Sequence, residues 1–343
     1  MTQEDLETIA REMVEKPKGI LAMDESHGTI GNRLQAVGLK NAKEVRSAYR
    51  EMLIATPGLG QYISGAILFT ETLYQKTSDG TPFPQALENQ GIIPGVKVDL
   101  GLEEMPSHPG EFVTKGLDGL AERLAGYREQ GAKFAKWRGV IYIKTREGLP
   151  SQDCIDENAN RLSIYAKISQ KQGLVPIVEP EVEMSGLHSI NDCYSITKAT
   201  LESVFNRLRH YSVNFQEMVL KPNMVVPGKD YKSGEISPEI IAEQTVKVLR
   251  ATVPEDVHGI AFLSGGLSDE DATNYLNEMN IAYKGKLPWN LTFSFGRGLQ
   301  REPLKIFAAK NGPDYIRNAQ EVLLQRAKEC SLATVGKYKA NKA

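Results

Sequence analysis

Charged side chains stand at or near the C-terminal ends of five short apolar segments that have the composition of strands. They are Asp24 after GILAM, Lys97 in GVKVD, Lys136 and Arg138 in FAKWR, Glu179 and Glu181 in IVEPE, and Lys221 in MVLKP. Residues two positions apart, such as Lys136 and Arg138, point to the same face of a strand. A site that gathers both signs of charge suits an anionic substrate and proton transfer.

A lone buried lysine is more often part of a structural ion pair than a catalytic group. Five strands that each bring charge to one end are harder to explain by structure alone, because every desolvated ion costs several kcal/mol. We therefore interpret the set as functional. A partly desolvated lysine among cationic neighbours loses its proton more easily and can attack a carbonyl, so Schiff-base chemistry at Lys221 is an option. Pro222 lacks an N–H, which places Lys221 at the end of its strand.

Two glycine-bearing segments, LSGG at 263–266 and SFGRG at 294–298, close the last two apolar segments. Backbone N–H groups in such turns, with an arginine fork beside them, suit a phosphate group. The five histidines show no H-x-H or H-x-x-x-H spacing, which disfavours a zinc mechanism. We expect neither a metal nor a cofactor.

The whole chain reads as an alternation of strands and helices. Eight apolar runs are expected to form strands, at 19–24, 65–69, 95–100, 134–143, 174–181, 218–222, 259–266 and 291–296. Helical periodicity separates them at 43–55, 116–130, 153–172, 192–211, 238–251 and 268–279. Runs that are apolar on both faces indicate a parallel sheet covered by helices. Eight units predict a (β/α)8 barrel with additional N- and C-terminal helices, and an open doubly wound sheet remains the alternative.

Composition limits the partners. Lys plus Arg (41) nearly balances Asp plus Glu (43) in 343 residues, so no basic field exists for nucleic acid or a membrane surface. Three distant cysteines, no signal-peptide pattern and no long apolar run indicate a cytoplasmic protein. With no linker or composition shift, residues 1–343 are expected to form a single domain.

The motifs together resemble the class I, Schiff-base family of fructose-1,6-bisphosphate aldolases. GILAMDES, ETLYQKTSDGTPFPQ, GVKVD, FAKWR, GLVPIVEPE, LKPNMVVPG, FLSGG and LTFSFGRGLQ occur in the family's order, and the likeness runs from about Ile9 to Tyr338. The resemblance implies a (β/α)8 barrel and a homotetramer. It also implies a glycolytic and gluconeogenic lyase that reversibly cleaves fructose 1,6-bisphosphate into dihydroxyacetone phosphate and glyceraldehyde 3-phosphate without a metal.

The resemblance also implies roles for individual residues. Lys221 is the Schiff-base nucleophile, Glu179 is the acid and base for dehydration, and Glu181 lies beside it. Asp24 accepts the C4 hydroxyl proton, while Lys136 holds the developing charges and favours the neutral amine of Lys221. The C1 phosphate is assigned to Ser264, Gly265, Gly296 and Arg297, and the remaining anion-binding wall to Ser26, Arg33, Lys97 and Arg138.

The chain differs from animal members of the resembled family near the second phosphate and at its C-terminal tail, and two rival functions remain as alternatives. Asn32 replaces a lysine of animal members near the second phosphate, and a short tail from about residue 334 ends at Ala343 without their terminal tyrosine. We therefore expect another group or water to protonate the enamine. A transaldolase-like or deoxyribose-phosphate aldolase-like enzyme shares the imine chemistry, but two phosphate clusters favour a bisphosphate. A catalytically idle scaffold barrel is expected to lack Lys221, Glu179 or Asp24, and this chain keeps all three.

Overall fold

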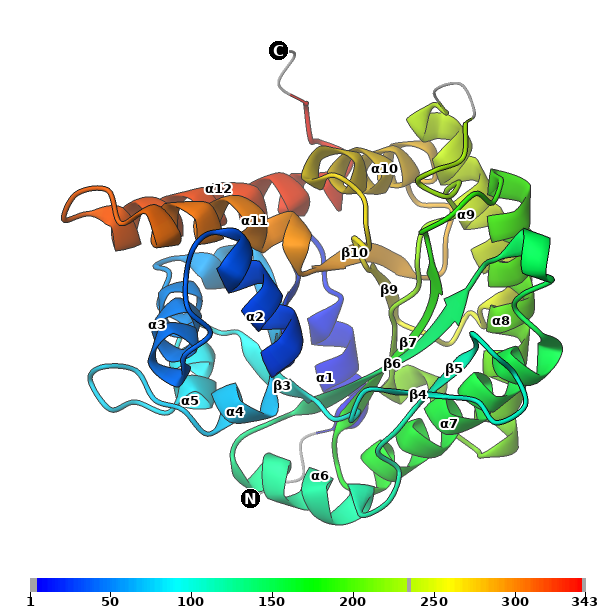
Figure 1. Cartoon of the computed structure of the whole chain (residues 1–343), viewed down its shortest axis with the longest axis horizontal. Helices are drawn as coiled ribbons and strands as arrows, with labels where there is room; N and C mark the ends of the chain where they lie inside the picture. Colours follow the sequence, from blue (N-terminus) through cyan, green and yellow to red (C-terminus); the bar gives the residue numbers. More distant parts are fainter. Residues whose placement is uncertain (1–4, 233–235, 341–343) are drawn as a thin grey trace.

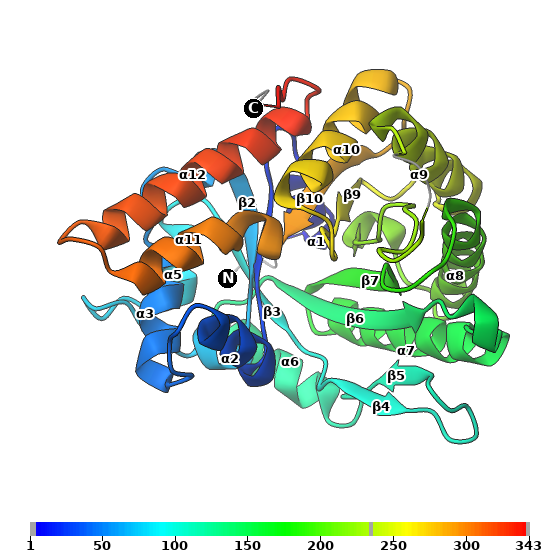
Figure 2. The ribbon, with the colours of Figure 1, turned by 45° about the horizontal axis from the view of Figure 1, so that its top comes forward.

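A closed barrel of eight parallel strands forms the centre of the computed structural model, which describes residues 5–232 and 236–340. Around the barrel the strands follow the order β1, β10, β9, β8, β7, β6, β3 and β2 (Figures 1 and 2). Their bounds are β1 Gly19–Met23, β2 Ile63–Leu68, β3 Ile93–Lys97, β6 Phe134–Tyr142, β7 Val175–Glu183, β8 Val219–Leu220, β9 Gly259–Phe262 and β10 Asn290–Phe295. The predicted barrel is confirmed, and closure rules out the open sheet.

Helices surround the barrel, as Figure 2 shows most clearly. They are α2 His27–Ala36, α3 Lys43–Ile54, α4 Thr70–Leu73, α5 Phe83–Glu88, α6 Leu120–Glu129, α7 Gln152–Lys171, α8 Ile190–His210, α9 Pro238–Thr252, α10 Asp269–Ala282, α11 Arg297–Ala309 and α12 Tyr315–Ala333. Short 3₁₀ turns lie at η1 Leu59–Gln61, η2 Thr145–Glu147 and η3 Phe215–Glu217. No helix in the described part of the chain has the length and apolar character needed to cross a membrane.

The six predicted helices correspond to α3 and α6 to α10, and one predicted boundary is wrong. The helix expected from residue 116 begins at Leu120, because Gly116 and Gly119 have φ angles of 119° and 63°, outside the helical region. The sequence analysis did not predict α2, whose Gly28 and Gly31 lower its helix propensity. It also missed an antiparallel hairpin of two short strands, β4 Leu102–Glu104 and β5 Phe112–Thr114.

Side chains that point into the barrel change character along the strands. In the N-terminal half, an apolar cluster includes Ala22, Phe134, Ile177 and Val219, all buried. Two residues further along each of these strands, the same face carries a charged residue. These residues are Asp24, Lys136, Glu179 and Lys221. The two-residue period of a strand therefore places a charged layer directly above an apolar one.

Helix α1 (Leu6–Met13) covers the N-terminal end of the barrel (Figure 1). Its apolar side chains belong to the same interior cluster as the inward residues of the strands. Ser64, near the start of β2, donates a hydrogen bond to the Met13 carbonyl at 2.6 Å. Val14 packs directly on Gly259, where a Cβ atom would lie only 2.5 Å from its side chain. One end of the barrel is thus closed by apolar packing, and the opposite end is left for chemistry.

Replacement of Gly95 by alanine is expected to destabilise the barrel. Gly95 lies opposite Phe134 in the ladder, and a Cβ atom at this position would meet the Phe134 ring at 2.2 Å. Forcing a methyl group into such a packed site costs about 1–3 kcal/mol. Urea unfolding should show a lower midpoint for Gly95→Ala. The control is Gly126→Ala in α6, where nothing lies within 4 Å, and its midpoint should not fall. Equal midpoints for Gly95→Ala and the parent chain would contradict this packing.

Candidate active site

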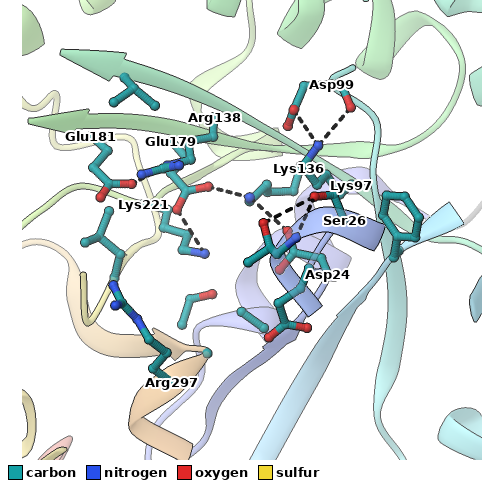
Figure 3. Close-up of a pocket in the computed structure, with 18 of the residues that line it drawn as sticks. Asp24, Ser26, Lys97, Asp99, Lys136, Arg138, Glu179, Glu181, Lys221 and Arg297 are labelled. Atoms are coloured by element: carbon teal, nitrogen blue, oxygen red, sulfur yellow. Dashed lines mark hydrogen bonds and ion pairs between the residues drawn. The ribbon is translucent and has the colours of Figure 1, made fainter. Parts of the chain in front are cut away.

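A cavity of about 850 Å³ opens at the C-terminal end of the barrel strands (Figure 3). Its size is within the range of small-molecule sites. All thirteen residues that the sequence analysis proposed for the site line it. Six cationic side chains and five carboxylates are among the lining residues, namely Arg33, Lys97, Lys136, Arg138, Lys221, Arg297, Asp24, Glu25, Asp99, Glu179 and Glu181.

Lys136 lies at the centre of this charge, between two carboxylates. Its Nζ atom is 2.9 Å from Asp24 Oδ2 and 2.8 Å from Glu179 Oε2 (Figure 3). Lys136 and Glu179 are 4% and 3% exposed, so water screens these contacts little. Asp24 follows β1 directly, Lys136 is the third residue of β6 and Glu179 is the fifth residue of β7, and all three line the cavity.

Lys221 contacts the other oxygen of Glu179, at 3.1 Å from Nζ to Oε1. It is 3% exposed and follows β8 directly, with its backbone N–H bonded to the Val178 carbonyl at 2.8 Å. The predicted place of Lys221, at a strand end just before Pro222, is confirmed. Lys221 was expected to lie among Lys136, Arg138 and Glu179, and its direct partner is the carboxylate of Glu179. Lys136 is the nearby cation, across that shared carboxylate.

The charges in this chain of contacts fix one another's ionisation. Burial raises the pKa of Asp24, but the positive charges of Lys136 and Lys221 outweigh it and hold that pKa well below its ordinary value. Burial likewise acts to raise the pKa of Glu179, and the same two lysines lower it overall. Burial acts to lower the pKa of Lys136, while Asp24 and Glu179 raise it. Both carboxylates are therefore ionised and Lys136 is protonated at neutral pH.

Two further ion pairs line the same cavity. The Lys97 Nζ atom lies 2.5 Å from Asp99 Oδ1 and donates a hydrogen bond to the Asp99 backbone carbonyl at 2.9 Å. The two residues of this i, i+2 pair thus balance each other's charge. Arg138 pairs with Glu181 across β6 and β7, and the carboxylate raises the pKa of the guanidinium despite burial. Both cations line the cavity.

The phosphate-binding candidates lie on the far side of the cavity, after β9 and β10. Gly265 has a φ of 51°, a left-handed conformation that glycine adopts without strain, and its carbonyl accepts a hydrogen bond from Arg297. Burial and the positive charges of Arg33 and other arginines lower the pKa of Arg297. Ser26 caps the N-terminus of α2 and also lines the cavity.

A buried network behind the cavity was not found by the sequence analysis. Glu25 is ion-paired with both Arg33 and Arg50, and it accepts a hydrogen bond from Gln300 at 3.0 Å. Gln300 also donates to the Ala22 carbonyl at 2.6 Å. Arg50 is 2% exposed, yet nothing in the sequence of its helix separates a buried arginine from a solvated one. Within residues 5–232 and 236–340, no group of three or more His, Cys, Asp or Glu is placed to hold a metal ion.

Comparison with known proteins decides the family. The family model for class-I fructose-bisphosphate aldolase matches residues 5–343. The chain belongs to this family. A probable class 1 fructose-bisphosphate aldolase of Xanthomonas campestris is 49% identical over 99% of this chain and 100% of its own length. A cytosolic aldolase of Arabidopsis thaliana is 50% identical over 94% of this chain and 88% of its own length.

A solved structure of the family superposes closely on this chain. The Plasmodium falciparum fructose-bisphosphate aldolase, crystallised with TRAP and a small-molecule inhibitor, gives a TM-score of 0.95 at 47% identity. The match covers 99% of this chain and 96% of that one. The resemblance identified from the sequence motifs is therefore confirmed, as are the aldolase activity and the Schiff-base class that come with the family.

Replacement of Lys136 by methionine is expected to move the pH dependence of catalysis. Lys136 lowers the pKa of both Asp24 and Glu179, so its loss raises both values. Each carboxylate then takes up a proton at a higher pH, and the acid limb of the kcat profile shifts upward. Loss of one buried electrostatic group should also lower kcat by roughly 10²–10³. Steady-state assays across the acid range measure both effects.

Lys198→Met is the matched control for this variant. Lys198 lies on α8, its side chain is 41% exposed, and it pairs with Glu202 at 2.8 Å. Its replacement should leave the kcat profile unchanged, because an exposed helical pair contributes little. An acid limb for Lys136→Met that coincides with that of the parent chain would contradict the role given to Lys136.

Proposed function

We propose that Lys221 carries the family's reaction in this chain, the reversible cleavage of fructose 1,6-bisphosphate into dihydroxyacetone phosphate and glyceraldehyde 3-phosphate. The supporting observation is a continuous chain of contacts. It runs from Lys221 through Glu179 and Lys136 to Asp24, with distances of 3.1, 2.8 and 2.9 Å. These contacts join a nucleophile, an acid and base, a fixed cation and a second base within one buried site.

Formation of the imine requires proton transfers that Glu179 can supply. Its Oε1 atom lies within hydrogen-bond reach of Lys221 Nζ, so it can accept a proton from that nitrogen. The neutral amine then attacks the ketone carbon to give a carbinolamine. Glu179 returns the proton to the leaving hydroxyl, and water departs to leave a protonated imine. The same carboxylate therefore acts first as base and then as acid.

Cleavage of the carbon–carbon bond requires a second base. Asp24 is ionised and lies on the opposite side of Lys136, where it can accept the proton of the C4 hydroxyl. As that proton leaves, the C3–C4 electron pair moves into the protonated imine and forms an enamine, and the aldehyde is released. Lys136 remains protonated throughout, and its positive charge stabilises the ionised form of each carboxylate before that carboxylate accepts its proton.

The two ends of the cavity provide for two phosphates. The turns at Ser264, Gly265 and Gly296, together with Arg297, are assigned to the C1 phosphate, because they lie at the usual phosphate position of a barrel. Ser26, Arg33, Lys97 and Arg138 form the remaining wall around the other end. Asn32 also lines the cavity and supplies no charge there.

The rival functions are less well supported. A barrel that handles only one phosphate does not require cationic side chains at both ends of the cavity. An idle scaffold does not require four buried charged residues to remain in contact, since buried ions cost free energy. We further propose, from the family resemblance and from relatives named as cytosolic, that the chain acts as a cytoplasmic homotetramer of single-domain subunits. The end of the predicted tail, with Ala343, lies outside the described residues.

Trapping of the imine tests the nucleophile directly. Incubation with dihydroxyacetone phosphate followed by borohydride should attach the three-carbon unit to Lys221, as mapped by mass spectrometry. Lys221→Met should give no adduct and lose cleavage activity, because methionine has no amine. Lys229→Met, a few residues along the chain, should be labelled like the parent protein. An adduct on another lysine would refute the assignment. Cleavage should also survive EDTA, and its loss would indicate a metal mechanism.

Replacement of Arg33 by methionine tests the assignment of the two phosphates. If Arg33 serves the phosphate remote from the ketone, KM for fructose 1,6-bisphosphate should rise roughly tenfold to hundredfold, the worth of one charged hydrogen bond. KM for fructose 1-phosphate should change little. Arg297→Met should raise KM for both sugars, since Arg297 is assigned to the phosphate that they share. Equal increases for both sugars in Arg33→Met would contradict the assignment.

A further inference from the structure

The backbone hydrogen bonds between β7 and β8 end just beyond Glu179 and Lys221. The register pairs Val178 with Leu220, and the last ladder bond runs from the Lys221 N–H to the Val178 carbonyl. The next residue on β7 is Pro180, which has no N–H to donate to the Lys221 carbonyl, the next position of this ladder. Main-chain pairing between the two strands therefore stops next to the groups that must stay aligned.

The side chain of Asn223 takes over where the ladder stops. Its Oδ1 atom accepts a hydrogen bond from the Val182 N–H of β7 at 3.0 Å. Its Nδ2 atom donates to Thr197 Oγ1 on α8 and to the Met224 carbonyl, both at 3.1 Å. The amide is thus satisfied at both ends, and Asn223 is only 5% exposed. It is not among the residues that line the cavity, so it does not touch a substrate there.

The neighbouring bonds show that only one side of the segment needs this substitute. Towards β9, the Pro222 carbonyl still accepts a main-chain bond from Leu263 N–H at 3.1 Å. Further along, the Val225 N–H is bonded to Thr245 Oγ1 of α9 at 2.9 Å. On the β7 side, the contact from Asn223 to Val182 stands in the place of the missing main-chain bond.

We propose that Asn223 is a positioning residue, which holds β7 and the segment after β8 at the separation that keeps Lys221 aligned with Glu179. The inference rests on the proposed roles of these two residues. Glu179 has to exchange a proton with the Lys221 nitrogen and then with the departing hydroxyl, and both steps need hydrogen-bond distances. A displacement of about 1 Å at such a site costs on the order of 10²-fold in rate. A buried side-chain amide that hydrogen-bonds across the two segments restricts such a displacement.

Asn223→Leu keeps a similar volume and removes both the acceptor and the donor. With saturating sugar bisphosphate, kcat should fall about tenfold to hundredfold. KM should stay within about threefold of the parent value, because the phosphate-binding residues are untouched. The rate at which borohydride-trappable imine forms on Lys221 from dihydroxyacetone phosphate should fall by the same factor as kcat. A residue that only stabilises the fold would lower the unfolding midpoint without changing this rate in the folded enzyme.

Asn158→Leu is the matched control. Asn158 is also a buried asparagine, 3% exposed, and its Nδ2 atom donates to the Phe112 and Cys154 carbonyls on the outer side of the barrel. This variant should lose stability, yet it should keep kcat within about twofold of the parent value. An equal loss of kcat in Asn158→Leu would overturn the positioning role of Asn223, and so would an unchanged imine rate in Asn223→Leu.

Thr197→Val provides a milder variant that decides the question if Asn223→Leu does not fold. It removes the hydroxyl that accepts from Asn223 and leaves the amide itself in place. We expect a fall in kcat of at least about threefold, with KM unchanged. An unchanged kcat in Thr197→Val would then refute the proposal. Failure of the parent protein to form any adduct on Lys221 is a different result, because it contradicts the proposed function and not the role of Asn223.

Discussion

The contact of Lys136 with two carboxylates is the constraint on which the rest of the site depends. Three charges brought together out of water are costly unless each one is paired in good geometry. Lys136 meets this condition for Asp24 and Glu179 at once, and Glu179 in turn pairs with Lys221. The barrel supplies the geometry because β1, β6, β7 and β8 each direct one inward side chain, within the strand or just after it, to the same place. Removal of Lys136 leaves Asp24 without its ion-pair partner in this set, and removal of Glu179 leaves Lys221 without its own.

The same constraint explains why one end of the barrel is closed and the other is charged. Inward positions in the lower half are filled by apolar side chains, and α1 covers that end. Water therefore reaches the charged layer only from the cavity side. The apolar layer beneath Lys136 lowers the local dielectric constant and strengthens its electrostatic contacts. These contacts lower the pKa of Asp24 and of Glu179, so both carboxylates are ionised in the absence of a ligand. A base that is already ionised needs no rearrangement before it accepts a proton.

Much of this arrangement could be predicted from sequence, and the exceptions have physical causes. All eight strands were predicted because each is a short apolar run, and seven of these runs have a charged or glycine-bearing end. The site residues were predicted because strand ends of a parallel barrel converge. Pairing was harder to predict, since which carboxylate meets Lys221 depends on ladder register and not on residue type. The network of Glu25, Arg50 and Gln300 joins residues up to 275 positions apart. No local pattern records such contacts.

Pro180 and Pro222 follow Glu179 and Lys221 directly, where the pairing of β7 with β8 ends. β7 continues past Glu179 and stays paired with β6 as far as Glu183, whereas its pairing with β8 ends at Lys221. Pro180 cannot donate the next bond of that ladder, so the chain after Lys221 can turn away and leave the amine facing the cavity. That freedom needs a replacement for the lost bonds. Side chains from Asn223 and Thr245 provide it from buried positions. The motif LKPNM thus contains the nucleophile, the residue that ends its strand, and the residue that restores the hold on the neighbouring strand.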